Sequence, residues 1–344
     1  MTTPDLRGGV DLHAHWFGAD ATPADGGLQT FPRLVVDGDR GRIMRGDQVF
    51  RDVRPSLWDV EARIRDLDAS GIEVQVISPV PVTFPYLEDL GAASAYAMAM
   101  NASIARAVRS GGGRLAGLGT VPLNHPYAAA DVLRAAMSGP TPLLGVEIGT
   151  RAGERELDDP ELLPFFEAAA EVDALVFVHP SDGGSGTVRR AGQPYDFGLG
   201  MHADTALAAG ALVFGGVLER FPGLRVVLAH GCGAFGWSYP RMRLGAELFQ
   251  GAAPEQLDEL DERVRSLYVD TLVLDPEHLR LLVHRFGAER IVLGTDHPFF
   301  PAITADARSF LADAEAGGIL PEGGAQQVFG ANGAGLLRPV GAPT

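Results

Sequence analysis

The sequence contains no lysine, because all 28 of its basic side chains are arginine. Without a lysine amine the chain can form neither a Schiff base with a carbonyl substrate nor a lysine-carbamate bridge between two metal ions. The only cysteine is Cys232, which excludes an internal disulfide and is typical of a protein of the reducing cytoplasm. The N-terminus lacks a basic segment followed by an apolar one, so we expect no signal peptide.

Long hydrophobic runs and positive charge are also missing. No apolar run approaches the ~20 residues that cross a bilayer, so we expect no membrane span. The formal net charge of −16 argues against an extended surface for nucleic acid or anionic membranes. A small anionic substrate remains compatible with this charge where a few arginines are concentrated locally. Hydrophobic residues make up 46% of the 344 residues, which is enough for a sizeable core.

Short β-branched runs alternate with longer amphipathic segments along the whole chain. This alternation predicts a parallel (β/α)8 TIM barrel that forms a single domain over residues 1–344, since such barrels commonly reach this length. A doubly wound open sheet is the alternative, because a strand count taken from pattern alone is fallible. The predicted strands are 9–15, 72–80, 114–121, 143–150, 174–180, 224–231, 265–273 and 290–296.

Two long connections interrupt the alternation. Residues 17–56, between the first strand and the first clear helix, are rich in glycine, aspartate and arginine. We expect them to form a small insertion over the C-terminal mouth of the barrel, because a connection of this length is usually functional. Residues 181–198 form a second long loop after the fifth strand. Helices are expected over 58–71 and over 159–172, the latter opened by an aspartate that can cap it.

Five titratable side chains mark the predicted ends of four strands, where the chemistry of a barrel collects. The i, i+2 spacing of His13 and His15 directs both side chains to one face of the first strand. His179 ends the fifth strand, His230 the sixth and Asp296 the eighth. One such histidine is commonly an ordinary hydrogen-bonded residue, but five together predict a catalytic site for Zn²⁺ or a similar divalent ion.

The order of these residues resembles the amidohydrolase superfamily, and the missing lysine fits its mononuclear branch. The segments 49–84, 215–235 and 290–299 are further similar to 2-amino-3-carboxymuconate-6-semialdehyde decarboxylases, and this resemblance extends over nearly the whole chain. It implies a cytoplasmic, homodimeric enzyme that decarboxylates a small conjugated or aromatic carboxylic acid without oxidation. No organic cofactor, nucleic acid or membrane partner is expected.

The resemblance also assigns roles to the residues. It implies that His13, His15, His179 and Asp296 hold one metal ion per chain, most simply zinc, although other divalent ions are compatible. His230 would take a proton from a metal-activated water and is the expected catalytic base, with Asp296 also part of the catalytic set.

The resemblance also points to residues that bind the substrate. Arg51 would bind a substrate carboxylate, because its planar fork suits bidentate binding. Arg241 would act in the site of the neighbouring subunit, and Phe299 would line the pocket. Phe197, which lies in a loop that departs from the family pattern, is also expected to line the pocket. Without the family match, Arg51 reads as a solvated loop arginine and Arg241 as a surface helix arginine.

The sequence departs from the family pattern in the wall of the pocket. The family typically has tryptophans after the fifth strand, whereas this chain has Ser181, Phe197 and His202 in that region. His297 replaces a tyrosine next to Asp296, and Cys232 stands where a glycine is usual. This pattern suits the same metal chemistry on a different substrate. Two alternatives stay open: a hydrolase of the same superfamily that cleaves a lactone, amide or C–N bond, and a catalytically silent binding protein.

Overall fold

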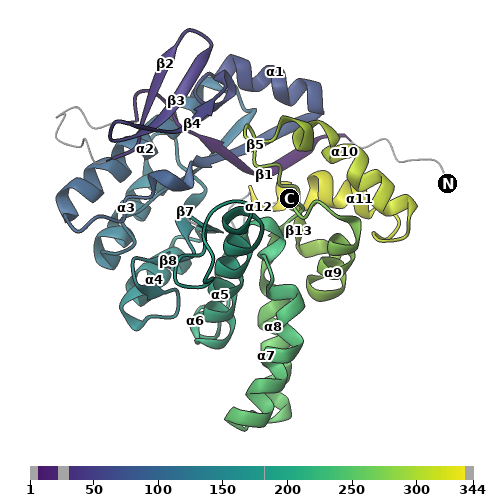
Figure 1. Cartoon of the computed structure of the whole chain (residues 1–344). Helices are drawn as coiled ribbons and strands as arrows, with labels where there is room; N and C mark the ends of the chain where they lie inside the picture. The colour runs from purple at the N-terminus through teal and green to yellow at the C-terminus, as the bar shows by residue number, and fades with distance from the viewer. Residues whose placement is uncertain (1–6, 22–30, 182, 338–344) are drawn as a thin grey trace.

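Eight parallel strands follow one another around a barrel in the computed structural model (Figure 1), which describes residues 7–21, 31–181 and 183–337. The strands occur in chain order around the sheet. They are β1 (Gly9–Trp16), β5 (Ile72–Pro79), β6 (Leu115–Gly119), β7 (Gly145–Gly149), β10 (Leu175–His179), β11 (Arg225–Leu228), β12 (Tyr268–Asp270) and β13 (Ile291–Val292).

The barrel closes between its first strand and the segment that follows its last one. The amide of Leu12 donates to the carbonyl of Leu293 at 2.8 Å, and the amide of His15 donates to the carbonyl of His297 at 2.8 Å. Because an open sheet has two free edges, this closure confirms the predicted (β/α)8 barrel and makes the doubly wound alternative wrong.

Helices connect successive strands and cover the outside of the barrel (Figure 1). The first of them, α1, begins where the carboxylate of Asp59 accepts the amide of Ala62 at 2.7 Å, and it ends at Gly71 in the left-handed conformation. The helices are α1 (Val60–Ser70), α2 (Leu90–Ser110), α3 (Pro126–Ser138), α4 (Leu163–Glu171), α5 (Met201–Phe214), α6 (Val217–Arg220), α7 (Phe235–Gln250), α8 (Pro254–Ser266), α9 (Pro276–Phe286), α10 (Pro301–Ala316), α11 (Gly324–Gln326) and α12 (Asn332–Leu336).

The described part of the 17–56 insertion contains a three-stranded antiparallel sheet of β2 (Arg33–Asp37), β3 (Arg40–Arg45) and β4 (Gln48–Val53). Sequence analysis missed these strands. Their two-residue Gly-Asp connections, which begin at Gly38 and Gly46 with positive φ angles of 61° and 57°, are hairpin signals that could have revealed them. A second small antiparallel pair, β8 (Arg151–Ala152) and β9 (Arg155–Glu156), follows β7.

The last strands of the barrel are shorter than predicted. β11 ends at Leu228 and β13 at Val292, so His230 and Asp296 lie in the turns beyond them and not at strand ends. Both residues have positive φ angles, 55° and 54°. In the sequence the apolar runs continue beyond the last residue that is hydrogen-bonded to a neighbouring strand. This explains why the predicted strands are too long.

The inside and the outside of the barrel wall have separate hydrophobic cores. The inner cluster includes Leu12, Leu175, Phe177 and Val227. Leu336 of α12 also belongs to the inner cluster. The larger cluster packs the outer faces of the strands against the helices. Together they leave one end of the barrel interior for polar side chains.

One helical stretch differs from the expectation that no apolar run is long enough to span a bilayer. Residues Asp196–Phe214, which join a π-helical turn to α5, are long and apolar enough to cross a membrane by length and composition. In this fold 44% of that stretch is buried, and α5 packs against α6 and α7. Core helices of globular proteins have the same composition.

Candidate metal centre

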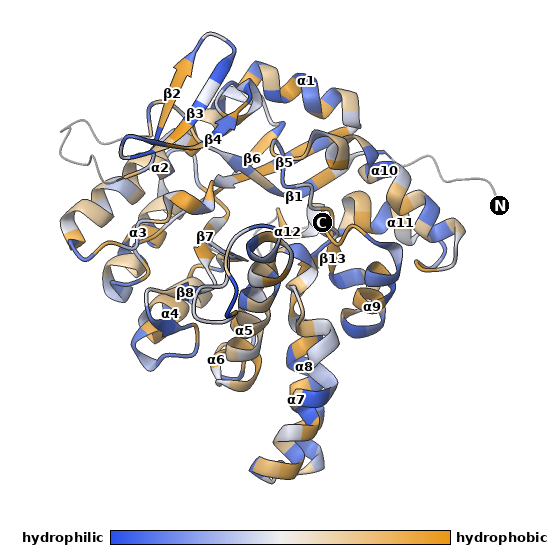
Figure 2. Cartoon of the chain, in the orientation of Figure 1, coloured by the Kyte–Doolittle hydropathy of each residue, from blue (hydrophilic) through white to orange (hydrophobic). Residues whose placement is uncertain are grey.

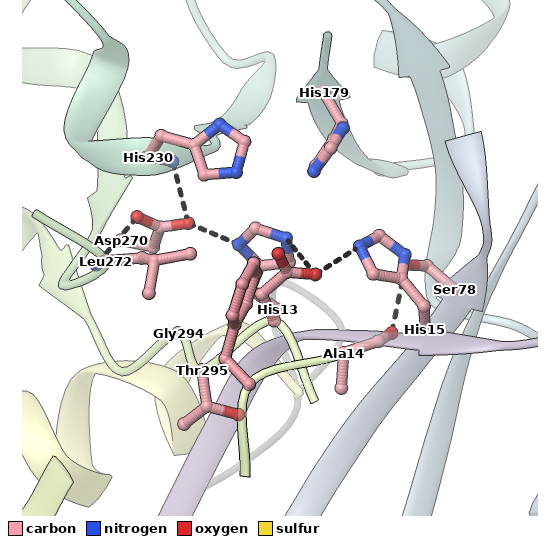
Figure 3. Close-up of polar contacts among 12 residues, drawn as sticks. His13, Ala14, His15, Ser78, His179, His230, Asp270, Leu272, Gly294 and Thr295 are labelled. Atoms are coloured by element: carbon pink, nitrogen blue, oxygen red, sulfur yellow. Dashed lines mark hydrogen bonds and ion pairs between the residues drawn. The ribbon is translucent and has the colours of Figure 1, made fainter. Parts of the chain in front are cut away.

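Five predicted residues converge in the barrel interior; the four histidines among them are labelled in Figure 3. His13 and His15 come from β1 with ring centroids 5.2 Å apart, as their spacing predicted. The ring of His179, at the end of β10, lies 5.0 Å from that of His13 and 5.1 Å from that of His15. His230 lies in the turn after β11, with its ring 4.8 Å from that of His179. The carboxylate of Asp296 reaches the cluster from the loop after β13, and Oδ1 lies 3.0 Å from Nε2 of His15.

Hydrogen bonds fix which nitrogen of each histidine is available. Nδ1 of His15 donates to the carbonyl of Pro79 at 2.9 Å, and Nδ1 of His179 donates to the carbonyl of Pro180 at 2.7 Å. Nδ1 of His13 lies 2.6 Å from the carboxylate of Asp270. Since a neutral imidazole carries one proton, each ring then presents the lone pair of Nε2 to the shared centre.

The facing atoms fit a bound cation. Within the described residues, Nε2 of His13 and Nε2 of His179 are buried without a hydrogen-bond partner. Oδ1 of Asp296 lies between Nε2 of His15 at 3.0 Å and Nε2 of His13 at 3.8 Å, and with both rings neutral neither nitrogen has a proton to donate to it. Buried polar atoms in native proteins are nearly always satisfied, so a cluster of unsatisfied acceptors indicates a missing positive partner. Candidate ligand atoms of His13, His15 and His179, and separately of His13, His230 and Asp296, all lie within 4.8 Å of one another. Imidazole nitrogens with one carboxylate are a typical donor set for a catalytic divalent metal.

Asp270, at the end of β12, organises the centre from behind and was missed by sequence analysis. It is fully buried and touches His13 through Oδ2. The same oxygen accepts the amide of His230 at 3.0 Å, while Oδ1 accepts the amides of Gly231 at 2.9 Å and Leu272 at 3.1 Å. A carboxylate behind a metal-binding histidine orients the ring and raises its basicity. Its place at a strand end of the barrel was the signal that could have found it.

His230 is held by its backbone, whereas its ring is left free. Nδ1 of His230 is buried and has no hydrogen-bond partner in the part of the chain that the structure describes. Burial, helped by the nearby His13, lowers the pKa of His230 to about 4, so the imidazole is neutral. The ring of His202 stacks beside it at 6.1 Å. A neutral, unengaged imidazole next to the centre can accept a proton.

Comparison with known proteins places the chain in a family. The amidohydrolase family profile matches residues 10–338. The chain belongs to the amidohydrolase family. It is also 33% identical over 265 residues to the 2-amino-3-carboxymuconate-6-semialdehyde decarboxylase of Dictyostelium discoideum, a match that covers 76% of this chain and 72% of the relative. The resemblance seen in the sequence motifs is therefore confirmed.

Solved structures agree with the fold of this amidohydrolase. The apo form of IDCase from Metarhizium anisopliae superposes with a TM-score of 0.80 at 23% identity, covering 96% of this chain and 97% of the other. The 5-carboxyvanillate decarboxylase of Novosphingobium aromaticivorans, whose structure contains manganese, superposes with a TM-score of 0.72 at 18% identity, covering 95% and 98%. At these identities the likeness establishes the (β/α)8 barrel.

Two of the expected substrate-binding residues lie beside the metal centre of the amidohydrolase. Cζ of Arg51, on β4, lies 4.5 Å from the ring centroid of Phe299. The ring of Phe299 lies 5.6 Å from that of His15. The insertion thus brings Arg51 next to the centre through a cation–π contact. Phe197 is 43% exposed, and its ring lies 5.8 Å from that of Phe300, the residue after Phe299.

Arg241 is not brought to the centre of its own chain. It lies on α7, a helix that projects from the barrel with α8 (Figure 1), and its side chain is exposed. Trp58 packs against Gly41 of the insertion and not in the site. Cys232 is buried, and burial raises the pKa of its thiol, as expected for a small packing residue and not for a nucleophile.

The histidine that replaces the family tyrosine, His297, turns away from the centre. Its Nε2 lies 3.0 Å from Oδ2 of Asp66 on α1. Asp66 also pairs with Arg54 at 3.0 Å, and Arg54 follows the strand that carries Arg51. His297 therefore ties the loop of Asp296 to the base of the insertion. Sequence analysis also missed Glu147 of β7, which is fully buried 3.9 Å from Nδ1 of His15 and whose pKa burial raises to about 7.

Proposed function

We propose that this amidohydrolase is a metal-dependent, non-oxidative decarboxylase of a small conjugated or aromatic carboxylic acid. The observation that carries the proposal is the buried cluster in the barrel, where Nε2 of His13 and Nε2 of His179 have no hydrogen-bond partner and Oδ1 of Asp296 lies beside the rings of His13 and His15. The curated relative named as a decarboxylase supports the reaction type, because it shares about a third of its sequence with this chain over most of its length.

We assign one divalent cation to His13, His15, His179 and Asp296. Three imidazoles and one carboxylate favour zinc, and the manganese in the 5-carboxyvanillate decarboxylase structure makes other divalent ions compatible. When bound, such an ion polarises substrate oxygens and lowers the pKa of water. No organic cofactor is part of the proposal.

His230 is proposed as the catalytic base. Its neutral imidazole lies against the ligand rings, and its backbone amide is fixed by Asp270 at 3.0 Å. This arrangement holds the ring in place while leaving it free to accept a proton and to return it to the substrate carbon that loses CO₂. Such positioned proton transfer contributes ~10²- to 10⁴-fold to a rate.

The substrate is proposed to be a small anion held by Arg51 and packed against aromatic rings. The guanidinium of Arg51 lies over Phe299, which orients it without a carboxylate partner among the described ion pairs. Phe299 supplies an apolar face beside His15, and Phe197 supplies another at the outer edge. The antiparallel sheet of the insertion thereby acts as one wall of the pocket in a single-domain protein of residues 1–344.

We further propose a homodimer in which Arg241 enters the site of the partner subunit. Arg241 lies on the same face of α7 as Trp237, Leu244 and Leu248, which are 80%, 48% and 63% exposed. Figure 2 shows hydrophobic residues along the projecting end of this helix. An exposed apolar stripe that brackets one arginine fits a protein interface. The buried lone thiol of Cys232 suits a cytoplasmic location.

Product analysis tests the proposed reaction. Protein stripped with a chelator and reloaded with Zn²⁺ or Mn²⁺ is incubated with hydroxybenzoates, anthranilates and conjugated muconate semialdehydes. We expect metal-dependent release of CO₂ and a product that lacks one carboxyl group, and no turnover by the His179→Ala control. A hydrolysed product without CO₂ would replace the decarboxylase with a hydrolase of the same superfamily.

A further inference from the structure

A buried polar network lies behind the metal centre, between the barrel wall and α1. Arg63 of α1 is fully buried, and its guanidinium donates to the backbone carbonyl of His15 and to Oε1 of Gln75 on β5. Nε2 of Gln75 donates to Oδ2 of Asp11 on β1 at 2.7 Å. The same oxygen of Asp11 accepts the hydroxyl of Thr295 at 2.7 Å. The network therefore links a helix, two strands and the loop that carries Asp296.

The network coincides with an irregularity of β1. The pairing of β1 with β5 shifts register between Asp11 and Ala14, as at a β-bulge. Leu12 belongs to the inner cluster, whereas the rings of His13 and His15 also point inward, so the shift is what turns His13 into the barrel. Oδ1 of Asp11 accepts the amide of His13 at 3.1 Å and the amide of Thr295 at 3.2 Å.

The hydrogen bonds of this network hold the backbone of the proposed metal ligands, and none of them involves a ligand atom. Asp11 fixes the amide of His13, Arg63 fixes the carbonyl of His15, and Thr295 immediately precedes Asp296. A metal site tolerates errors of only about 0.2 Å in its ligand distances, so the backbone behind the ligands has to be held. One network reaches three of the four proposed ligands.

We propose that Arg63, Gln75 and Asp11 are positioning residues that set the metal affinity of the centre. This inference rests on the proposed function, because it requires that the centre binds a metal. Gln75 is the connecting member, since its amide accepts from Arg63 on one side and donates to Asp11 on the other. An apolar side chain of similar size at this position, such as methionine, removes both bonds at once.

Burial of this network is difficult to explain by stability alone. A buried cation and a buried carboxylate each lose hydration, and replacement of buried ionic groups by apolar ones is often neutral or stabilising. Burial lowers the pKa of Arg63 to about 9, so the guanidinium remains charged at neutral pH. Removal of Gln75 alone leaves Arg63 and Asp11 without that partner and is expected to lower stability as well, so metal affinity has to be compared with a control variant that loses a similar Tm.

A pair of matched variants tests the inference. Gln75→Met removes the connecting amide, and Asn101→Met serves as its control. Asn101 is a buried amide on α2 that bonds the backbone of Thr120 in both directions, at 3.0 and 2.7 Å, away from the proposed ligands. For each protein we measure the Kd for Zn²⁺ by competition with a chromogenic chelator, and the Tm of the metal-free form.

We expect the Kd of Gln75→Met to rise about 10-fold or more, as for other groups that orient ligands from behind, while that of Asn101→Met changes less than about 2-fold at a similar loss in Tm. An unchanged Kd in Gln75→Met would overturn the inference. If that variant does not fold, Thr295→Val removes only one hydroxyl from the network and is expected to raise the Kd about 3-fold, less than the ~10- to 100-fold typical of whole orienting groups. An unchanged Kd there would equally overturn the inference. Wild-type protein that binds no divalent metal contradicts the proposed function as well, whereas wild-type protein that binds metal but releases no CO₂ contradicts the reaction alone.

Discussion

Replacement of Asp270 by asparagine is the perturbation whose size follows most directly from the contacts. The carboxylate receives donors at both oxygens: Nδ1 of His13 and the amide of His230 at one, and the amides of Gly231 and Leu272 at the other. Asparagine keeps the size but offers a single oxygen. Its NH₂ group must therefore face donors on one side or the other, so the variant loses at least one bond and the negative charge behind His13.

Two separate arguments give the same size for the expected loss of metal affinity in Asp270→Asn. A hydrogen bond to a charged group contributes ~1.5–3 kcal/mol, and Asp270 is fully buried, so solvent does not screen it. Since ~1.4 kcal/mol corresponds to tenfold in an equilibrium constant, this loss predicts a ~10- to 100-fold weaker metal complex. Carboxylates behind metal-binding histidines typically change metal affinity by about the same factor.

The assay is a titration of metal-free Asp270→Asn with Zn²⁺ against a chromogenic chelator, with wild type and Asp261→Asn in parallel. Asp261 is a matched control, because its carboxylate also accepts a short bond, from the hydroxyl of Tyr239 at 2.6 Å, and it lies on α8 away from the centre. We expect the control to bind metal like the wild type. A Kd of Asp270→Asn within about 2-fold of wild type would refute the role of Asp270 behind His13.

Three further outcomes are expected. His230→Ala should keep its metal and lose ~10²-fold or more in kcat, which elemental analysis and steady-state kinetics measure; a metal-free variant would make His230 a ligand. Mixing inactive Arg241→Ala with inactive His230→Ala should regenerate activity, because hybrid dimers contain one intact site, and no recovery after proven subunit exchange would count against the shared site. The 2-amino-3-carboxymuconate semialdehyde should be a poor substrate, since the family tryptophans are replaced around Phe197; a kcat/KM above ~10⁴ M⁻¹s⁻¹ would contradict this.

The sequence predicted the barrel and the convergence of five titratable side chains in it, because both depend on local signals. Apolar runs of four to eight residues place the strands, and the spacing of His13 and His15 fixes their common face. The positions of His230 and Asp296 were less accurate. Each lies in a turn with positive φ, and a run of apolar residues does not show where the backbone leaves the ladder.

The residues behind the metal centre could not be predicted from the local sequence pattern. Arg63 and Gln75 lie on a helix and a strand whose periodicity is satisfied without them, and Asp11 and Thr295 are 284 residues apart in sequence. Their roles arise only when the barrel closes. For Arg241 the fold of one chain adds nothing to the sequence. Its exposed position on α7 agrees both with a surface arginine and with a residue that serves a partner subunit.

Metal stoichiometry tests the central claim most directly. Wild-type protein and His179→Ala are stripped with a chelator, reloaded with Zn²⁺, freed of excess metal and subjected to elemental analysis. The proposal that His13, His15, His179 and Asp296 together hold one cation predicts that the wild type retains about one zinc per chain and the variant little or none. Two metals per wild-type chain, or none, would contradict the assignment of a single metal centre.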